Sequence, residues 1–363
     1  MDNKKKKFKI WKIPVYLIIA VILAVAAYVA YVFLTYSRIE DNLALEVEGT
    51  ADEVASVGEK YKIVTYNIGY GANMADYTFF MDGGKESRAR SKESVIECIT
   101  GTAETALSFD PDIVLFQEAD TDSTRSYHVD ETDMIKDIFA KHGDYDSVFA
   151  ENYHSAYLMY PPTDPIGASY SGLITESRLG ITSALRRSLP IATDFNKLLD
   201  LDRCYSIMRI PTDNGKELVV INTHLSAYGT DAAQGSAQLE MLFSDMKAEY
   251  EKGNYVICGG DYNHDFTTTS KKYFNPDVEA SLSWTEPFPD DAIPAGLSKC
   301  TDYTGDLVPT ARHTNEPYNE NSLTIILDGF IISDNVTPLL VENVDKAFKY
   351  TDHNPVVMEF VLN

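Results

Sequence analysis

The sequence predicts an α+β fold, in which two packed β-sheets are covered by helices and preceded by a membrane-spanning segment. Three observations support this prediction. A long uncharged apolar run follows a basic N-terminus. From residue 60 onward, many short strand patterns are interrupted by a few helical ones, which is typical of packed sheets with a helical cover. The chain has 363 residues, of which 44% are hydrophobic, so it can bury a large core.

The apolar run at residues 13–34 is predicted to be an uncleaved transmembrane helix. At a helical rise of about 1.5 Å per residue, the run spans the ~30 Å hydrocarbon core of a bilayer. A cleaved signal peptide is the alternative, but its apolar region is usually about 7–15 residues long. No small-residue cleavage site follows Leu34, which favours an anchor.

The lysines before this run predict its orientation. Residues 1–12 contain six lysines, and basic segments stay on the cytoplasmic side of a membrane. We therefore expect a single-pass protein with a cytoplasmic N-terminal tail, an anchor, a polar linker at 35–59 and an extracytoplasmic domain at 60–363.

The charge of the chain bears on its partners. The formal net charge is -24, and residues 1–12 carry six lysines and one aspartate, so the remainder carries -29. Such a surface repels polyanions, which argues against a high-affinity DNA or RNA binder. It does not exclude a nuclease whose metal ions neutralise the local field, and acidity also keeps an exported domain soluble.

The secondary-structure patterns can be placed in order along the domain. Strand patterns occur at residues 60–67, 112–117, 202–210, 217–223, 255–258, 323–333 and 356–362, and helical patterns at 91–109 and 231–251. The Asn214-Gly215 turn predicts a hairpin between the third and fourth strands. The segments 68–90 and 264–320 are rich in Gly, Pro, Asp and Tyr, and are predicted to form loops around a site.

The four cysteines do not indicate a metal centre. They are widely spaced, without a CxxC pair or a Cys/His cluster: Cys98, Cys204, Cys258 and Cys300. Cys98 and Cys258 are expected to be small buried hydrophobic residues. The sequence leaves open whether a disulfide forms.

Polar residues at the ends of apolar strands are the candidates for a functional site. These are Asn67, Glu118, Asn222, His224, Asp261, Asn263, Asp328, Asp352 and His353. A charged group at the end of a buried strand is costly unless it is paired or bound to a metal. Taken singly, each also suits a turn, a loop cap or a buried histidine. Together they predict a site of carboxylates, amides and imidazoles, whose oxygen ligands suit Mg²⁺ or Mn²⁺.

The order of these residues carries a family resemblance. The segments Thr-Tyr-Asn67, Gln-Glu118, Asn222-Thr-His224, Gly-Asp261-Tyr-Asn263, Leu-Asp328-Gly-Phe-Ile and Asp352-His353-Asn-Pro resemble, in order, the motifs of the endonuclease/exonuclease/phosphatase family. The resemblance covers residues 60–363. It implies a four-layer α/β-sandwich, with two mainly antiparallel sheets flanked by helices. The presence of His224 favours the branches that contain deoxyribonuclease I, sphingomyelinases and inositol polyphosphate phosphatases.

The resemblance also implies roles for the motif residues. Glu118 would bind Mg²⁺ or Mn²⁺ with Asn67 and Asp352. Asp261, supported by Asn263, would orient or activate the attacking water. His353, aligned by Asp328, would contact the phosphate and transfer a proton, and His224 would act as a second donor.

Four further residues are expected to bind substrate: Asn222, Arg88, Arg125 and Arg312. The arginines stand out in so acidic a domain, and their planar guanidinium groups suit phosphate. Surface ion pairs in an acidic domain are the alternative explanation for them.

These observations predict a membrane-anchored, metal-dependent hydrolase that acts on a phosphodiester or phosphomonoester. We expect a small or lipid-linked substrate, and a monomer. An extracellular nuclease is a second hypothesis, and nucleic acid is disfavoured by the charge. A catalytically silent surface domain that binds a ligand is a third. The complete set of motif residues argues against it, because a silent domain has no physical need to keep them all.

Overall fold

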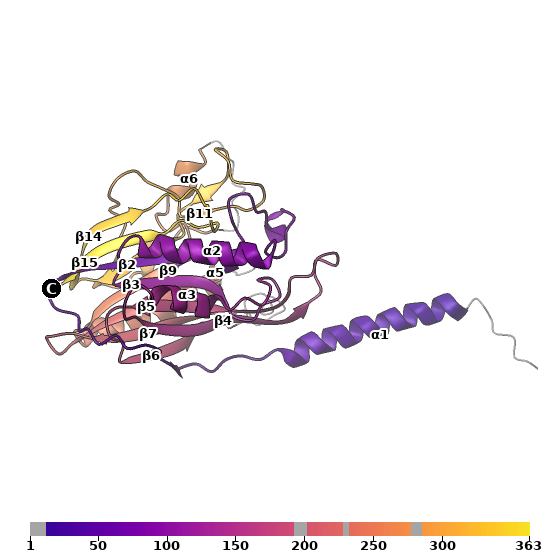
Figure 1. The fold of residues 1–363 in the computed structure, drawn as a ribbon, viewed down its shortest axis with the longest axis horizontal. Helices are drawn as coiled ribbons and strands as arrows, with labels where there is room; N and C mark the ends of the chain where they lie inside the picture. Colours follow the sequence, from indigo (N-terminus) through magenta and orange to yellow (C-terminus); the bar gives the residue numbers. More distant parts are fainter. Residues whose placement is uncertain (1–11, 192–201, 228–231, 277–284) are drawn as a thin grey trace, which may run out of the picture.

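Two β-sheets pack face to face in this chain, and helices cover their outer surfaces (Figure 1). The computed structural model describes residues 12–191, 202–227, 232–276 and 285–363. Among the strands of the two large sheets, β2 and β3 are parallel, as are β8 and β9, and the other paired neighbours are antiparallel. The predicted fold class is therefore confirmed.

One sheet has six strands in the order β14-β15-β2-β3-β5-β4. In chain order these are β2 (Lys60–Asn67), β3 (Ile113–Asp120), β4 (Asp146–Leu158), β5 (Gly167–Ser177), β14 (Val336–Asn343) and β15 (Val356–Leu362). The strands β2 and β3 lie at its centre, so residues 63–67 of β2 and nearly all of β3 are buried.

The other sheet has seven strands in the order β1-β6-β7-β8-β9-β13-β10. In chain order these are β1 (Leu43–Leu45), β6 (Ser183–Ser188), β7 (Cys204–Pro211), β8 (Glu217–His224), β9 (Tyr255–Asp261), β10 (Leu297–Lys299) and β13 (Asp328–Ser333). A separate two-stranded ribbon consists of β11 (Ala311–Arg312) and β12 (Thr324–Ile325).

Alternating side chains divide the core into layers. In β3, Ile113 and Leu115 face the other sheet, where they pack in one apolar cluster with Val220 and Ile257. Val114 and Phe116 face the opposite way, into a second cluster under helices. Side chains of a strand alternate between its two faces, so a buried central strand contributes to both clusters.

Three helices form the outer layers. Helices α2 (Lys92–Leu107) and α3 (Glu131–Phe139) cover the six-stranded sheet, and α5 (Ala232–Glu251) covers the seven-stranded one. The hydroxyl of Ser91 caps α2 by accepting from the Ser94 amide. The order helix, sheet, sheet, helix is the expected four-layer sandwich. Shorter elements lie in the loops: η1 (Gly69–Gly71), η2 (Phe80–Asp82), α6 (Ser270–Phe274) and η3 (Asp290–Ala292).

Several elements differ from those predicted. The strand expected at 323–333 is two strands, because β12 pairs with β11 whereas β13 pairs with β9. The strands β4, β5, β6 and β14 were not predicted, since Ser, Gly, Tyr and charged residues interrupt their apolar patterns. The segment 35–59 is expected to be a linker, yet β1 extends the edge of the seven-stranded sheet and Glu48 bridges to Ser147.

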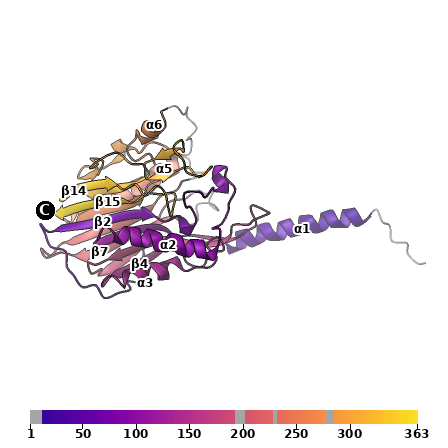
Figure 2. The same cartoon turned by 45° about the horizontal axis from the view of Figure 1, so that its top comes forward.

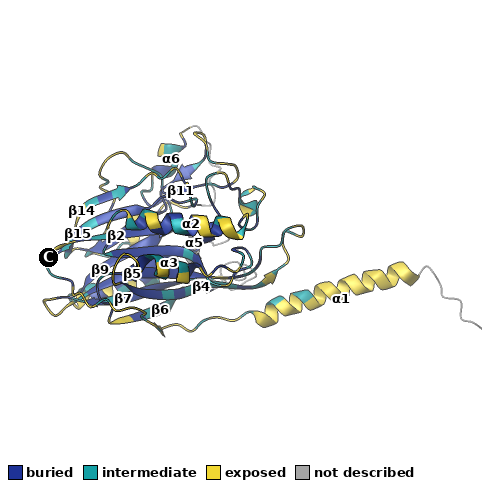
Figure 3. Cartoon of the chain, in the orientation of Figure 1, coloured by how far each residue is buried: buried dark blue, intermediate teal, exposed yellow. Residues whose placement is uncertain are grey.

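The N-terminal helix α1 (Lys12–Thr35) projects away from the sandwich (Figure 2). None of its residues is buried, so Figure 3 shows it exposed along almost its whole length. It is long and apolar enough to cross a membrane. The basic tail expected before it lies, apart from Lys12, outside the described residues.

Candidate active site

The ends of five strands converge at one edge of the sandwich. In the seven-stranded sheet, β8, β9 and β13 are neighbours, and their register places His224 opposite Asp261 and Asp261 opposite Asp328. From the six-stranded sheet, β2 ends at Asn67 and β3 carries Glu118. Because the sheets pack face to face, residues far apart in the sequence meet here.

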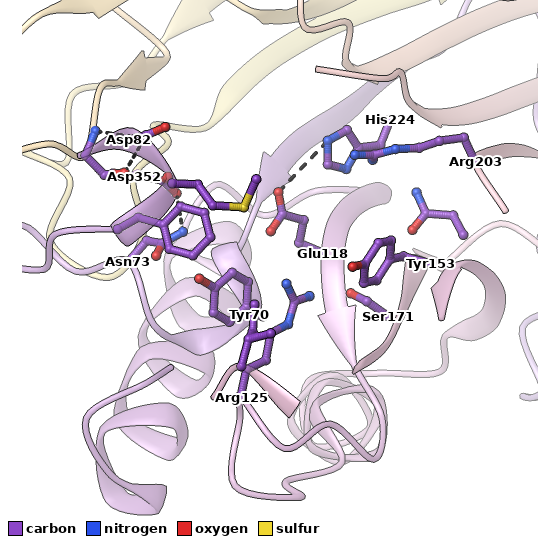
Figure 4. A pocket seen from close by; sticks show the side chains of 15 residues that line it. Tyr70, Asn73, Asp82, Glu118, Arg125, Tyr153, Ser171, Arg203, His224 and Asp352 are labelled. Carbon is purple, nitrogen blue, oxygen red and sulfur yellow. Dashed lines mark hydrogen bonds and ion pairs between the residues drawn. The ribbon is translucent and has the colours of Figure 1, made fainter. Parts of the chain in front are cut away.

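Glu118 reaches the site through a backbone irregularity. The pairing of β3 with β5 shifts register between Phe116 and Ala119, and Glu118 has a φ of 60°. A β-bulge of this kind redirects a side chain, and a positive φ is costly for a residue with a Cβ. The Glu118 side chain is consequently 27% exposed in a mostly buried strand, and it lies in a pocket (Figure 4).

Asn67 links two carboxylates that come from different sheets. Its amide nitrogen lies 3.1 Å from Oε1 of Glu118 and 3.1 Å from Oδ2 of Asp261. Its amide oxygen accepts from the backbone N–H of Gly69 at 3.0 Å. Asn67 is fully buried, so this bridge holds the carboxylates at a fixed separation.

His353 lies between two carboxylates. Its Nδ1 is 2.8 Å from Oδ2 of Asp328, and its Nε2 is 3.7 Å from Oδ2 of Asp261. Burial by itself would lower the pKa of His353, but the charge and hydrogen bond of Asp328, together with the charge of Asp261, raise this pKa to about 10. The imidazole is therefore a cation at neutral pH.

Asp261 is fixed by the turn that follows it. The backbone N–H of Asn263 donates to Oδ1 of Asp261 at 2.9 Å, and the Asn263 amide donates to the carbonyl of Leu225 at 2.8 Å. Burial and the nearby charge of Asp328 raise the pKa of Asp261 to about 6. The oxygen Oδ2 is left facing His224, His353 and Asn67.

His224 differs from His353 in charge. Its Nε2 lies 3.6 Å from Oδ2 of Asp261 and 3.9 Å from Oε1 of Glu118, and its buried Nδ1 has no hydrogen-bond partner. Burial, followed by the positive charges of Arg203 and His353, lowers its pKa well below the usual value. The site thus pairs a neutral imidazole with a protonated one.

The pocket beside these residues has a volume of about 170 Å³. Arg125 lies on one wall, with its guanidinium 3.8 Å from the ring centre of Tyr70 and bidentate hydrogen bonds of 2.8 and 3.0 Å to Asp120. Glu118 lies between Asp352 and His224 in the view of Figure 4. The pocket therefore offers a fixed cation on one wall and carboxylates on another.

The donor set of the pocket fits a divalent cation. Burial raises the pKa of Glu118, the charge of Arg125 opposes this rise, and the charge of Asp352 adds to it, so two carboxylates repel each other in this region. Oxygen ligands are those that Mg²⁺ and Mn²⁺ prefer, and a cation between the carboxylates would relieve their repulsion. A second group of potential ligand atoms, all within 4.8 Å of one another, comes from Asp261, Asp328 and His353. There the positive charge of the protonated His353 already offsets the charge of the carboxylates.

The structure brings most of the sequence-predicted residues together, and leaves three of the expected substrate ligands outside the pocket lining. Asn222 is buried between the sheets, where its amide nitrogen donates to the carbonyls of Phe116 and Ile174. Arg88 pairs with Asp164. Arg312 is buried and donates to backbone carbonyls in the loop that follows β2.

Other residues that line the pocket were not foreseen. Asn73 donates to Oδ1 of Asp352 at 3.1 Å, and its only signal in the sequence is its place in the loop after Asn67. Asn152, Tyr153 and Ser171 come from β4 and β5, the strands that the pattern of hydrophobic residues did not reveal.

Sequence comparison adds nothing to this geometry, because no protein-family model and no curated protein matches the chain. The fold, in contrast, is similar to solved structures. An endonuclease/exonuclease/phosphatase protein from Beutenbergia cavernae DSM 12333 is 16% identical, with a TM-score of 0.56 over 84% of this chain and 72% of that one.

Two further structures agree. ANGEL2, a 2',3'-cyclic phosphatase in complex with adenosine-2',3'-vanadate, is 14% identical, with a TM-score of 0.53 over 88% of this chain and 99% of that one. A family protein from Leptotrichia buccalis C-1013-b is 13% identical, with a TM-score of 0.53 over 83% and 99%. The chain therefore has the endonuclease/exonuclease/phosphatase fold, as its motifs predicted.

Proposed function

We propose that this chain, which has the endonuclease/exonuclease/phosphatase fold, is a metal-dependent phosphoesterase that α1 holds at a membrane. One observation carries the proposal. Asp261 lies between a protonated His353, a neutral His224 and the amide of Asn67, beside a pocket that holds Glu118. Attack of water on phosphorus needs a base or orienting carboxylate, a proton donor and neutralisation of the phosphoryl oxygens.

The chain's own residues supply the first two needs. The buried Asp261 orients the attacking water, since its Oδ1 is fixed by the Asn263 amide and its Oδ2 faces the site. His353 donates a hydrogen bond to the phosphoryl group and a proton to the leaving oxygen, because Asp328 keeps its ring charged and oriented. His224 binds a second phosphoryl oxygen.

The third need is met by a cation. Glu118 and Asp352 would hold Mg²⁺ or Mn²⁺, and Asn67, whose amide nitrogen donates to Glu118, would position that carboxylate. The ion supplies charge neutralisation at the phosphoryl oxygens. Asn73 positions Asp352 by its hydrogen bond of 3.1 Å, and the bulge at β3 positions Glu118.

The substrate is best explained as a small or lipid-linked phosphoester. The net charge of -29 outside the basic tail repels a polyanion, and Arg125 and Arg203 line the compact pocket, where they can contact one phosphate group. A nuclease is the second candidate, supported by the single-strand DNA product bound to D. rerio TDP2, whose solved structure has a similar fold. The lysines of the N-terminal tail support a location of the domain outside the cytoplasm, because basic segments stay on the cytoplasmic side of a membrane.

A panel of esters tests the proposal. The full-length chain in detergent would be assayed with bis-p-nitrophenyl phosphate, p-nitrophenyl phosphate, inositol polyphosphates, sphingomyelin and plasmid DNA, with Mg²⁺ or EDTA. Asp261→Asn and His353→Gln should abolish turnover, whereas Asp334→Asn, at an exposed turn, should not. A folded chain that hydrolyses none of these esters would instead support a silent binding domain.

A further inference from the structure

The tip of the β4–β5 hairpin lies against the apolar helix α1. Met159 donates its backbone N–H to the hydroxyl of Tyr28 at 2.9 Å, and Tyr157 donates its own to the hydroxyl of Tyr31 at 3.2 Å. The Tyr28 hydroxyl also contacts the carbonyl of Tyr157 at 3.3 Å. Because β4 is the outermost strand of its sheet, these hydroxyls satisfy backbone groups that would otherwise be unpaired.

The position of these contacts along α1 determines how deep the hairpin tip would lie in a bilayer that α1 crosses. Tyr28 lies seven residues before Thr35, the end of the helix, which is about 10 Å along its axis. Tyrosines concentrate where a membrane meets water, since the ring is apolar and the hydroxyl is polar. If α1 crosses a bilayer, a residue this far inside the helix lies below the membrane surface, so the hairpin tip contacts lipid and not bulk water.

Apolar side chains continue from the hairpin to the pocket. The ring of Tyr160 lies 5.7 Å from that of Phe80, which lies 5.0 Å from Phe79. Phe79 and Met81 line the pocket, whereas Met159 and Tyr160 do not. We call Phe79, Phe80, Met81, Met159 and Tyr160 the apolar rim. Its outer members are strongly exposed, at 42% for Met81, 57% for Met159 and 65% for Tyr160.

The rim is held in place by polar contacts behind it. Ser87 donates to Oδ2 of Asp164 at 3.0 Å, and Arg88 forms an ion pair with the same carboxylate. These contacts tie the hairpin connection to the loop that carries Phe80. The Asp164 charge is therefore paired with Arg88.

We propose that the apolar rim contacts the bilayer that holds α1 and keeps the mouth of the pocket at the membrane surface. This proposal rests on the phosphoesterase function and narrows it, because the substrate is then the phosphoester headgroup of a lipid in that bilayer. A contiguous apolar edge beside a membrane-spanning helix is explained by contact with lipid, whereas a soluble substrate gives it no role. The negative charge of the domain favours a zwitterionic bilayer over an anionic one.

Contact with lipid can be measured without any activity. The full-length Met159→Cys variant would be labelled with the environment-sensitive dye NBD and reconstituted into phosphatidylcholine vesicles. The four native cysteines are buried, so the introduced thiol reacts selectively, and mock-labelled wild type corrects for the rest. Leu339→Cys, on β14, is the control at an exposed site far from α1. We expect a blue shift and quenching by doxyl-labelled lipid at 159 only. Equal, unquenched emission at both sites overturns the proposal.

The substrate class is tested by two pairs of substitutions. The rim pair Met159→Ser/Tyr160→Ser would be compared with the control pair Tyr273→Ser/Leu339→Ser, which removes two exposed apolar side chains elsewhere. The substrates are sphingomyelin or phosphatidate in phosphatidylcholine vesicles and, separately, soluble bis-p-nitrophenyl phosphate. The rim pair should lower turnover of the vesicle lipid about tenfold and leave the soluble ester within about twofold. The control pair should change neither.

The possible failures differ from one another. Equal losses on both substrates would place the rim pair's effect in the pocket or in the stability of the domain, and would overturn the proposal. Turnover of the soluble ester without turnover of any vesicle lipid would overturn the substrate class while the phosphoesterase function stands. A wild type that hydrolyses neither substrate would overturn the proposed function itself.

Discussion

Nδ1 of His353 lies 2.8 Å from Oδ2 of Asp328. Asp328 begins β13, which pairs with β9, the strand that carries Asp261. The contact fixes both the orientation and the charge of the imidazole. His353 is buried, so without this carboxylate its protonated form would lose its main source of stabilisation.

Replacement of Asp328 by Asn should therefore impair chemistry more than binding. Asp328→Asn keeps the shape of the side chain but removes its charge, so the ring loses its preference for the protonated state. We expect kcat to fall about 100-fold or more, with KM nearly unchanged. Steady-state kinetics with bis-p-nitrophenyl phosphate measure both constants.

Asp334→Asn provides the control for this substitution. Asp334 lies in the exposed turn just after β13, so the same change in chemistry there should leave kcat unaffected. If Asp328→Asn raised KM and left kcat intact, the role assigned to His353 as a proton donor would be refuted.

Glu118 is expected to hold the metal, so Glu118→Gln should weaken metal binding. The amide keeps the size of the side chain and removes one negative charge from the pocket. The Mn²⁺ concentration that gives half-maximal activity should rise at least about tenfold. Isothermal titration with Mn²⁺ would show the same loss without relying on turnover.

Glu359→Gln, on β15, is the matched control for Glu118→Gln. Glu359 is partly exposed and pairs with Lys62 on the surface of the six-stranded sheet. Its replacement should leave the Mn²⁺ titration unchanged. An unchanged titration for Glu118→Gln would instead move the metal site to the group around Asp261.

The sequence was informative where burial and chemistry coincide. The strand patterns that end at Asn67 and His224 predicted β2 and β8, because a covered strand must be apolar until it emerges at the sheet edge. The same reasoning identified Asp261 at the end of β9. Residues at such ends need a partner, which is why the sequence alone predicts that they converge.

Residues positioned by a departure from regular structure were harder to place. The bulge that turns Glu118 into the pocket has no signature in the alternation of β3. Tyr153 and Ser171 lie on strands whose exposed and polar residues hide their period. Arg312 is a residue for which the sequence suggested a role in the site that the structure does not support. A charged residue near a motif suggests contact with substrate, but Arg312 donates hydrogen bonds to backbone carbonyls of a loop.

Arg125 should be sensitive even to replacement by lysine. Its guanidinium makes two hydrogen bonds with the fully buried Asp120 and stacks on Tyr70. Lysine keeps the charge but not the planar fork, so Asp120 would be left partly unsatisfied. We expect Arg125→Lys to lower the free energy of unfolding by about 1–3 kcal/mol and to raise KM.

Arg178→Lys tests whether this effect depends on burial. Arg178 pairs with Asp110, whose side chain is 81% exposed. A lysine there should cost less than about 0.5 kcal/mol in urea denaturation. Similar losses for the two variants would show that the bidentate contact with Asp120 is not what distinguishes Arg125.

Glu176 gives the stability of the fold a dependence on pH. It is buried in β5 and accepts a hydrogen bond of 2.8 Å from Ser147, and burial raises its pKa to about 8. Between the unfolded value near 4.5 and the folded value, the native state holds a proton that the unfolded state has released. The contribution of Glu176 to stability should therefore fall as the pH rises from about 5 to 8.

Glu176→Gln should remove this dependence, since a neutral amide fills the same space without titrating. Thermal melts at pH 5 and pH 8 would compare the variant with the wild type. We expect the variant to gain roughly 3 kcal/mol relative to the wild type between pH 5 and pH 8, because each unit of pKa difference is worth about 1.4 kcal/mol. Glu217→Gln, in a partly exposed ion pair with Arg209, should produce no such relative gain. If the two proteins kept a constant difference in Tm across this range, Glu176 would have to be ionised in the folded state at both pH values. The cost of its burial would then be met by neighbours such as Lys136.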